Sequence, residues 1–412
     1  MKRARIEMSF VSEADASIVK KFFKSFYKEN YSKLYIPSRL PEREFGYFTF
    51  EKKLMIRHLS FNSSQELWRE IVEKTPLHIY HSAAFYKYPR APMDAKGWLG
   101  AELIFDIDAD HLKTPCEKRH DFKVCKRCRK AYPISLDLCP DCGQPLMKVE
   151  WICDLCLEAA REEARKLLSF LEDDLGFSKF RAAFSGNRGY HLVVEDESIL
   201  ELDQAERKEL IDYITGTGLS MKLMGLEERV IDLETAPKLE DPSWRGRIAK
   251  AVFELLASQN YEILREVAGN SIAQTLINEI KEISKALGEH VPWNLMRPRL
   301  RRILFEAARE LASAHIDVVV TQDIHRLLRL GNSLNGKTGL MAKMFDPDEL
   351  DEFEPLSESV ALPMDDELTV YVIRTPKFKL GEMEFEETEN ELKKLPAAAA
   401  TLLLCKGAAT LP

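Results

Sequence analysis

Helical and strand-like patterns of apolar residues alternate along most of the chain. Ser12 to Tyr31 carries apolar residues at helical spacing and predicts an amphipathic helix. Leu157 to Leu175 predicts a longer helix that ends at Gly176. From about Leu200 to Glu310, helix-forming residues dominate and prolines separate the pieces. We expect this stretch to form a helical subdomain inserted into an α/β core.

Shorter segments alternate with period two, in the manner of strands. Asn62 to Glu73 looks helical, with Ser64 as a possible cap, whereas Pro76 to Pro92 is tyrosine-rich and irregular. Asp346 to Leu368 is acidic, contains prolines and predicts an exposed connection. The segments that predict strands are Arg43–Phe50, Leu54–Phe61, Phe180–Ser185, Tyr190–Val194, Ile316–Val320, Thr369–Ile373 and Phe378–Phe385.

Length and charge narrow the possible functions. A chain of 412 residues is long for one core and predicts two or three structural units. Its formal net charge of −8 requires any nucleic-acid contact to come from a local basic surface, since the overall field repels a polyanion. With no apolar run of about 18 residues and no signal-peptide pattern, we expect a cytoplasmic protein without a membrane segment. Leu395 to Cys405 predicts a packing helix, with Pro396 in its first turn.

Two carboxylates interrupt an apolar strand at Leu103 to Asp108. Residues two apart on a strand face the same side, so Asp106 and Asp108 project together. Two anions held this close repel each other unless a cation lies between them, and a divalent ion with oxygen ligands, Mg²⁺ or Mn²⁺, suits the pair. A strand that ends in a turn would give the same spacing, but the preceding apolar run favours a metal site.

Seven of the eight cysteines lie between residues 116 and 156, which in a reducing compartment indicates metal binding. Cys-x-x-Cys pairs bring two thiolates to one ion, and four such ligands close a structural Zn²⁺ site. Ten residues also separate Cys142 from Cys153, and His111 is an alternative to His120, so the pairing stays open. The expected zinc sites are a ribbon of Cys125, Cys128, Cys139 and Cys142, and a knuckle of Cys116, His120, Cys153 and Cys156.

Basic residues gather at the tip of the expected ribbon. Such a tip suits a contact with nucleic acid or with a protein partner, and a solvated tip is the alternative. These residues are Lys123, Lys126, Arg127, Arg129 and Lys130.

A glycine-rich turn, Ser185-Gly-Asn-Arg-Gly-Tyr-His191, lies between two predicted strands. Its glycines let a ligand approach the backbone, Ser185 offers a hydroxyl, and Arg188 and His191 can hold phosphate oxygens. A polar hairpin turn would look similar, so the turn alone does not settle its role.

A third acid, Asp317, is expected on a later strand, and Arg329 and Lys337 follow it around a second glycine-rich turn. Carboxylates combined with phosphate-binding cations are what two-metal phosphoryl transfer requires. Asp323 and Asp232 are rivals for the third carboxylate.

In their order and combination, these segments resemble the small catalytic subunit of archaeal and eukaryotic DNA primase over nearly the whole chain. The resemblance implies a metal triad of Asp106, Asp108 and Asp317. It also implies that Ser185, Arg188 and His191 contact nucleotide phosphates and that Arg329 belongs to the same pocket. The segments that carry it are Arg43-Glu-Phe-Gly46, Phe105-Asp-Ile-Asp108, the Cys/His knuckle before a long helix, Ser185 to His191, and Asp317 through Lys337-Thr-Gly339.

The resemblance also implies a fold and partners. The expected fold class is α/β (α+β), with an RRM-like mixed β-sheet core. The expected parts are a catalytic core at 1–199 and 311–388, a zinc module at 116–156, a helical subdomain at 200–310 and a C-terminal helix at 389–412. An iron–sulfur-containing large subunit is the implied partner, with single-stranded DNA as template and nucleoside triphosphates as substrates.

The chain departs from the family pattern at two places. Asn335 stands where the family commonly has histidine, and the ribbon is inserted into a knuckle that is usually compact. The expected activity is template-directed synthesis of short primers by two-metal phosphoryl transfer, with the choice between ribonucleotides and deoxyribonucleotides left open. The alternatives are a gap-filling repair polymerase, an Asp-x-Asp glycosyltransferase and a zinc-stabilised nucleic-acid-binding scaffold. The scaffold is favoured if the three aspartates prove to be far apart.

Overall fold

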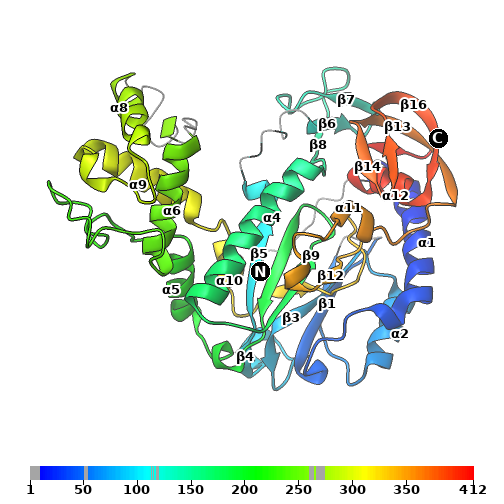
Figure 1. Ribbon diagram of the computed structural model, residues 1–412. Coiled ribbons are helices and arrows are strands. Elements are labelled where there is room, and N and C mark those ends of the chain that lie inside the picture. The colour runs from blue at the N-terminus through cyan, green and yellow to red at the C-terminus, as the bar shows by residue number, and fades with distance from the viewer. Residues whose placement is uncertain are drawn as a thin grey trace. The chain divides into compact units, whose positions relative to one another are not determined.

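The fold of the chain is given by a computed structural model that describes residues 10–50, 54–112, 114, 116, 120–258, 264–265 and 274–412 (Figure 1). The chain divides into two compact units. The first comprises Met1–Glu162, Lys179–Ala205 and Ile316–Pro412, and the second comprises Glu163–Ser178 and Glu206–His315. Within the described residues, no helix combines the length and the apolar character that a bilayer span needs.

The first unit contains two core sheets whose paired strands run antiparallel. One has the order β11-β3-β1-β2, with β4 also paired to β3, and the other has the order β12-β9-β10-β5. This combination of helices with antiparallel sheets confirms the predicted α+β class. The core strands are β1 (Arg43–Phe48), β2 (Met55–Leu59), β3 (His78–Tyr86), β4 (Trp98–Ala101), β5 (Leu103–Asp108), β9 (Phe180–Phe184), β10 (Gly189–Val194), β11 (Leu327–Arg329) and β12 (Met344–Phe345).

A hydrophobic cluster joins the two core sheets. Ala83 of β3 and Leu328 of β11 pack with Ile104 of β5, Val193 of β10 and Val320 of the short helix α10 (Val318–Gln322). All five residues are buried. Because burying a valine, leucine or isoleucine contributes about 1.5–3 kcal/mol, this cluster fixes β5 and β10 against the first sheet.

The cysteine-rich segment and the C-terminal segment add smaller sheets to the first unit. The ribbon sheet has the order β7-β6-β8, and a second small sheet has the order β16-β13-β17. Figure 1 shows them next to each other, and β7 contacts β13. Their strands are β6 (Phe122–Cys125), β7 (Lys130–Tyr132), β8 (Met147–Val149), β13 (Glu367–Thr375), β16 (Thr388–Pro396) and β17 (Ala409–Thr410), and β14 (Phe378–Leu380) pairs with β15 (Met383–Phe385).

Helices of the first unit begin at the polar caps that the sequence offers. Ser12 caps α1 by accepting the backbone N–H of Asp15, whose carboxylate accepts the N–H of Ser12 in return. The cap of α2 is Ser63, one residue before the expected Ser64. The helices are α1 (Glu13–Asn30), α2 (Ser64–Lys74), α11 (Pro355–Glu358) and α12 (Ala397–Lys406), and α4 (Asp154–Ser169) runs from the first unit into the second.

The second unit is helical, and it takes in more of the chain than the expected 200–310. Its helix α6 packs against α8 and α9. Arg247 forms an ion pair with Asp174 at 3.1 Å, and Trp293 donates its indole N–H to the carbonyl of Pro237 at 2.8 Å. The elements are α5 (Gln204–Ile214), α6 (Ser243–Ser258), α8 (Gln274–Lys285), α9 (Pro298–Ala312) and the π-helical turn η5 (Phe170–Asp174).

Three further local predictions are wrong. The stretch 76–92, expected to be irregular, contains the central strand β3. The strand expected over 316–320 is replaced by α10, and residues 389–396, expected to be helical, belong to β16. Tertiary pairing explains β3 and β16, since each aligns with a neighbouring strand along its length.

Candidate active site

The acidic strand β5 pairs directly with the strand that follows the glycine-rich turn. Asp106 lies opposite His191, and Asp108 lies opposite Gly189. A Cβ atom at Gly189 would lie 2.0 Å from the carbonyl oxygen of Ile107, so only glycine permits this close pairing. The imidazole Nε2 of His191 is 3.5 Å from a carboxylate oxygen of Asp106. The two predicted motifs, separated by about 80 residues of sequence, therefore meet on one sheet.

Asp317 lies beside the free edge of β5. Its backbone N–H donates to the carbonyl of Asp106 at 2.8 Å. Its carboxylate accepts the N–H groups of Val319 and Val320 at 2.9 and 3.2 Å, which caps α10. This cap explains why a valine-rich segment forms a helical turn here. Asp108 likewise accepts the N–H of Asp110 at 3.0 Å.

The three aspartates are thus adjacent in backbone position, and two of their carboxylates make local hydrogen bonds. Among the described residues, the clusters whose ligand atoms all lie within 4.8 Å of one another are cysteine-rich and do not include these carboxylates. Of the rivals, Asp323 lies at the far end of α10 and accepts the N–H of His325, and Asp232 belongs to the second unit.

His191 and Arg329 line the same pocket, together with Tyr35, His81 and Arg181. Burial lowers the pKa of His191 to about 4, and the charge of Arg329 acts in the same direction. At neutral pH His191 is therefore a neutral imidazole that can donate one hydrogen bond. Its contact with the strand β5 is not an ion pair.

His78 holds Arg329 in place. Its Nδ1 is 2.6 Å from the Arg329 guanidinium and accepts the N–H of Gly336 at 3.2 Å. Burial keeps the pKa of His78 well below its ordinary value, with Arg329 and Lys337 acting in the same direction, so Nδ1 is available as an acceptor. His78 was not predicted as a site residue, because its segment was expected to be irregular.

The two glycine-rich turns are bonded to each other through Asn335. Its side-chain N–H group donates to the carbonyl of Ser185 at 2.8 Å, and its side-chain oxygen accepts the N–H of Lys337 at 2.9 Å. Thr338 donates to the carbonyl of Gly186. Asn335 is buried. Asn335, which stands where the family commonly has histidine, therefore connects the two turns. Ser185 and exposed Lys337 lie on the two segments joined in this way.

Arg188 makes its contacts with acidic residues and with the base of the cysteine region. It forms an ion pair with Asp110, donates to the carbonyl of Trp151 at 3.3 Å and lies 3.7 Å from a carboxylate oxygen of Glu150. Arg188 thus connects the Ser185–His191 turn, called the nucleotide turn below, to the base of the cysteine region.

Lys406, which was not among the predicted site residues, reaches the Ser185–His191 turn from the end of α12. Its ammonium group donates to the side-chain oxygen of Asn187 at 2.8 Å. Burial lowers the pKa of Lys406 to about 7, and Arg188 and Lys337 act in the same direction. No motif predicted this contact, because a lysine at a helix C-terminus is common.

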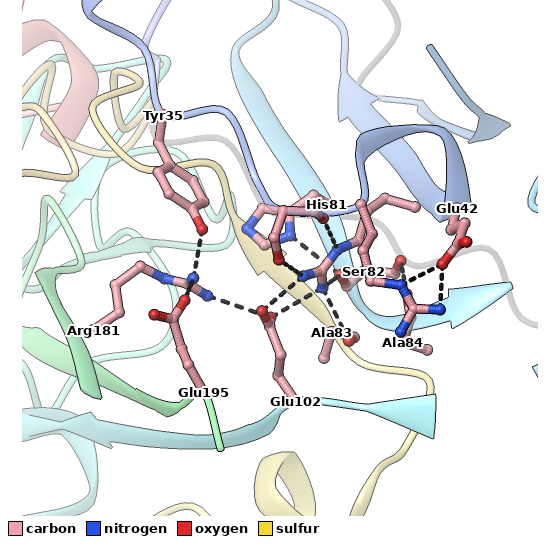
Figure 2. A network of polar contacts seen from close by, with 12 residues as sticks. Tyr35, Glu42, His81, Ser82, Ala83, Ala84, Glu102, Arg181 and Glu195 are labelled. Atoms are coloured by element: carbon pink, nitrogen blue, oxygen red, sulfur yellow. Dashed lines mark hydrogen bonds and ion pairs between the residues drawn. The ribbon is translucent and has the colours of Figure 1, made fainter. Parts of the chain in front are cut away.

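A buried ion network, drawn in Figure 2, shares Tyr35 and Arg181 with the pocket. Glu102 pairs with Arg43 at 2.7 Å and with Arg181 at 3.3 Å, and Arg181 also contacts Glu195 and the hydroxyl of Tyr35. Burial acts to raise the pKa of Glu102, but the two guanidinium groups outweigh it and the pKa lies below its ordinary value. Because Arg43 is on β1 and Arg181 on β9, the network connects the two core sheets.

The cysteines form two separate groups, each with ligand atoms within 4.8 Å of one another. In the knuckle group, Cys116, His120, Cys153 and Cys156 meet, with sulfur–sulfur distances of 3.1 and 3.6 Å. In the ribbon group, Cys125, Cys128, Cys139 and Cys142 meet, at 3.5 and 3.9 Å. A tetrahedral ion with metal–sulfur bonds of about 2.3 Å separates its ligands by roughly 3.8 Å, so both groups fit a metal of this kind. The side chain of His111 lies outside the described residues.

The knuckle group has an ordered outer layer of contacts. His120 turns Nε2 toward Cys156 at 3.4 Å and places Nδ1 2.7 Å from the carboxylate of Asp121. That carboxylate also accepts the N–H of Trp151 at 2.9 Å. A histidine held in this way by a carboxylate is typical of metal ligation.

Comparison with known proteins agrees with this arrangement. Residues 140–347 match the family model described as DNA primase small subunit. A DNA primase small subunit of Cenarchaeum symbiosum is 33% identical over 97% of this chain and 99% of its own length. The corresponding proteins of Nitrosopumilus maritimus and Pyrobaculum calidifontis are 30% and 34% identical, over 97% and 94% of this chain and 100% and 96% of their own lengths. The chain therefore belongs to the DNA primase small-subunit family.

Proposed function

We propose that this chain is the catalytic subunit of a DNA primase, a nucleotidyltransferase that makes short primers from nucleoside triphosphates on single-stranded DNA during replication. The observation that carries the proposal is the meeting of β5, β10 and the start of α10. This meeting places Asp106, Asp317 and the pocket residue His191 around one sheet edge. The relatives of Cenarchaeum symbiosum and Nitrosopumilus maritimus, which match nearly the whole chain, are named as DNA primase small subunits.

We assign Asp106, Asp108 and Asp317 as the ligands of Mg²⁺ or Mn²⁺. Their carboxylate oxygens are the hard donors that these ions prefer. Two bound metal ions would neutralise charge on the triphosphate and lower the pKa of the attacking 3′-hydroxyl. Asp317 and Asp108 also accept the backbone N–H groups of Val319 and Asp110, which restricts the orientation of both carboxylates.

The phosphate-binding roles are proposed for residues of the pocket and the two turns. Arg329, oriented by His78, supplies a fixed positive charge, and neutral His191 supplies one N–H. Ser185 and Lys337 lie on the turns that Asn335 joins, and we assign both to the triphosphate. Arg188 remains a predicted phosphate contact, and its ion pair with Asp110 supports a second role in holding the turn.

The two cysteine groups are assigned to structural Zn²⁺. Both are closed four-ligand sets with no position left for a substrate, which is typical of structural zinc. The proposed partners are a primase large subunit, the single-stranded template and nucleoside triphosphates. We place the reaction in the cytoplasm.

The test is primer synthesis on an unprimed single-stranded template with labelled nucleoside triphosphates. The wild-type chain should form dinucleotides and longer primers, whereas Asp106→Asn and Asp108→Asn should form none and should melt at an unchanged temperature. Asp94→Asn is the matched control, because Asp94 is an exposed acid of the same unit and should leave synthesis intact.

Two results would overturn the assignment. Wild-type synthesis that requires an existing primer would favour the gap-filling polymerase. Retained dinucleotide synthesis in either Asp106→Asn or Asp108→Asn would reject the metal site.

A further inference from the structure

The ribbon is a part of the molecule that the proposed catalytic reaction does not use. It is a small β-sheet that carries the four ribbon cysteines. Its tip is exposed to solvent: the exposed fraction is 37% for Leu136 and 59% for Leu138. Residues 122–149 contain six lysines and arginines against two aspartates, whereas the whole chain has a net charge of −8. Even if four thiolates and one Zn²⁺ add a charge of −2, the ribbon keeps a positive balance.

Two arginines of the tip have no acidic partner among the residues that the structure describes. Lys123 and Lys130 form ion pairs with Asp137 and Asp141, each at 2.7 Å. By contrast, the exposed side chains of Arg127 and Arg129 make no hydrogen bond or ion pair with any residue that the structure describes.

The cysteine turn fixes the backbone beneath these arginines. The N–H of Arg129 donates to the carbonyl of Cys125 at 2.8 Å, and the N–H of Cys128 lies 3.4 Å from the sulfur of Cys125. Arg129 adopts a left-handed backbone conformation with φ of 54°. Two charged side chains are therefore presented from a rigid turn, which limits the entropy lost when they bind an anion.

The base of the ribbon is attached to the proposed nucleotide site. Arg188 of the nucleotide turn bonds to Trp151 and lies near Glu150, just beyond β8. On the other side, Phe122 of β6 lies under Arg374, with the guanidinium 5.4 Å from the ring centroid. Strand β6 is four residues long, so it spans about 13 Å between this base and the tip. The tip is therefore one short strand away from the proposed nucleotide site.

We propose that the ribbon tip binds the phosphate backbone of single-stranded nucleic acid, with Arg127 and Arg129 as its phosphate contacts and Leu138 as an apolar neighbour for a base. The inference deepens the proposed function, because the strand it would hold is the template. Unpaired arginines favour phosphate, and a phosphate contact of this kind is independent of base sequence.

The test measures binding of a fluorescein-labelled oligothymidylate by the full chain over a series of salt concentrations, without nucleotide or divalent ion. Each phosphate contact to a single strand contributes about 0.7 to the slope of log affinity against log salt, so R127A/R129A should lower the slope by about 1.4. R127K/R129K should largely restore it. The control K24A/K28A removes the same charge from exposed positions of α1 and should keep the wild-type slope.

Zinc content and melting temperature show whether R127A/R129A still folds, and both should equal the wild-type values. A salt slope of R127A/R129A equal to that of the wild type would overturn the proposal, as would an equal loss in K24A/K28A. The same comparison in an Asp106→Asn background separates the two proposals, because the ribbon effect should persist there even if primer synthesis proves not to be the activity.

Discussion

The knuckle and the ribbon use the same ligand chemistry in different surroundings. Around the knuckle, Asp121 bonds both His120 and the backbone of Trp151, and Trp151 in turn accepts a hydrogen bond from Arg188 of the nucleotide turn. Around the ribbon, the nearest polar neighbours are Tyr132, which contacts Cys139 at 3.3 Å, and exposed Asp141. The knuckle is therefore part of the structure that supports the active site, whereas the ribbon lies outside that support.

The largest effect should follow from losing a knuckle ligand. Cys153→Ser should remove one zinc per chain and lower the free energy of unfolding by about 4 kcal/mol or more, because the ion no longer holds residues 116–156 together. The KM for nucleotide should rise as the partners of Arg188 shift. Metal analysis, thermal melting and steady-state kinetics check these outcomes. A normal KM in a variant that lacks this zinc would remove the link to the active site.

A smaller effect is expected for Asp121, which bonds both the zinc ligand His120 and the backbone of Trp151. Asp121→Asn should weaken zinc binding at the knuckle by about 10- to 100-fold, since the carboxylate orients His120. It should also raise the KM for nucleotide while the ribbon zinc stays bound. Competition with a chromogenic chelator gives the zinc affinities. Equal zinc affinity in Asp121→Asn and wild type would show that the carboxylate does not act on the metal.

The matched change in the ribbon should be milder still. Cys139→Ser should also reduce zinc to one per chain, but without a rise in the KM for nucleotide, because no ribbon ligand bonds to the nucleotide turn among the described contacts. Its loss should appear in template affinity. If Cys139→Ser raised the KM for nucleotide as much as Cys153→Ser, the distinction between the two groups would fail.

The last effect concerns pH and lies outside both metal groups. The pKa of His191 is about 4 in the folded chain, below its ordinary value of 6.5. Burying this imidazole neutral therefore favours folding fully above pH 6.5, and the contribution is lost as the pH falls toward 4. The free-energy difference between wild type and His191→Gln should shrink over that range, measured by denaturant unfolding. A difference independent of pH would mean that the histidine is not buried as a neutral group.

Features that depend on residues close together in the sequence were predicted correctly. The two ligand groups follow from the spacing of the cysteine pairs, and the structure resolves their pairing as the one first expected. The strands around Asp106 and His191 were predicted because their apolar runs are continuous and a glycine-rich turn separates β9 from β10. These features depend on neighbours in sequence.

Features that depend on distant segments were missed. Three valines after Asp317 predicted a strand, but the carboxylate of Asp317 caps a helical turn whose Val320 packs between the core sheets. Lys406 and His78 became recognisable only through their contacts with Asn187 and Arg329. No periodicity in the sequence reports such contacts, because each joins segments more than 200 residues apart.

The assignment of Asp317 as the third metal ligand is tested most directly by binding of Mn²⁺, followed by electron paramagnetic resonance in the presence of a nucleoside triphosphate. Wild type and Asp323→Asn should bind Mn²⁺ equally, since Asp323 lies at the far end of α10, and Asp317→Asn should bind it much more weakly. Unchanged Mn²⁺ binding in Asp317→Asn, or its loss in Asp323→Asn, would contradict the three-carboxylate site.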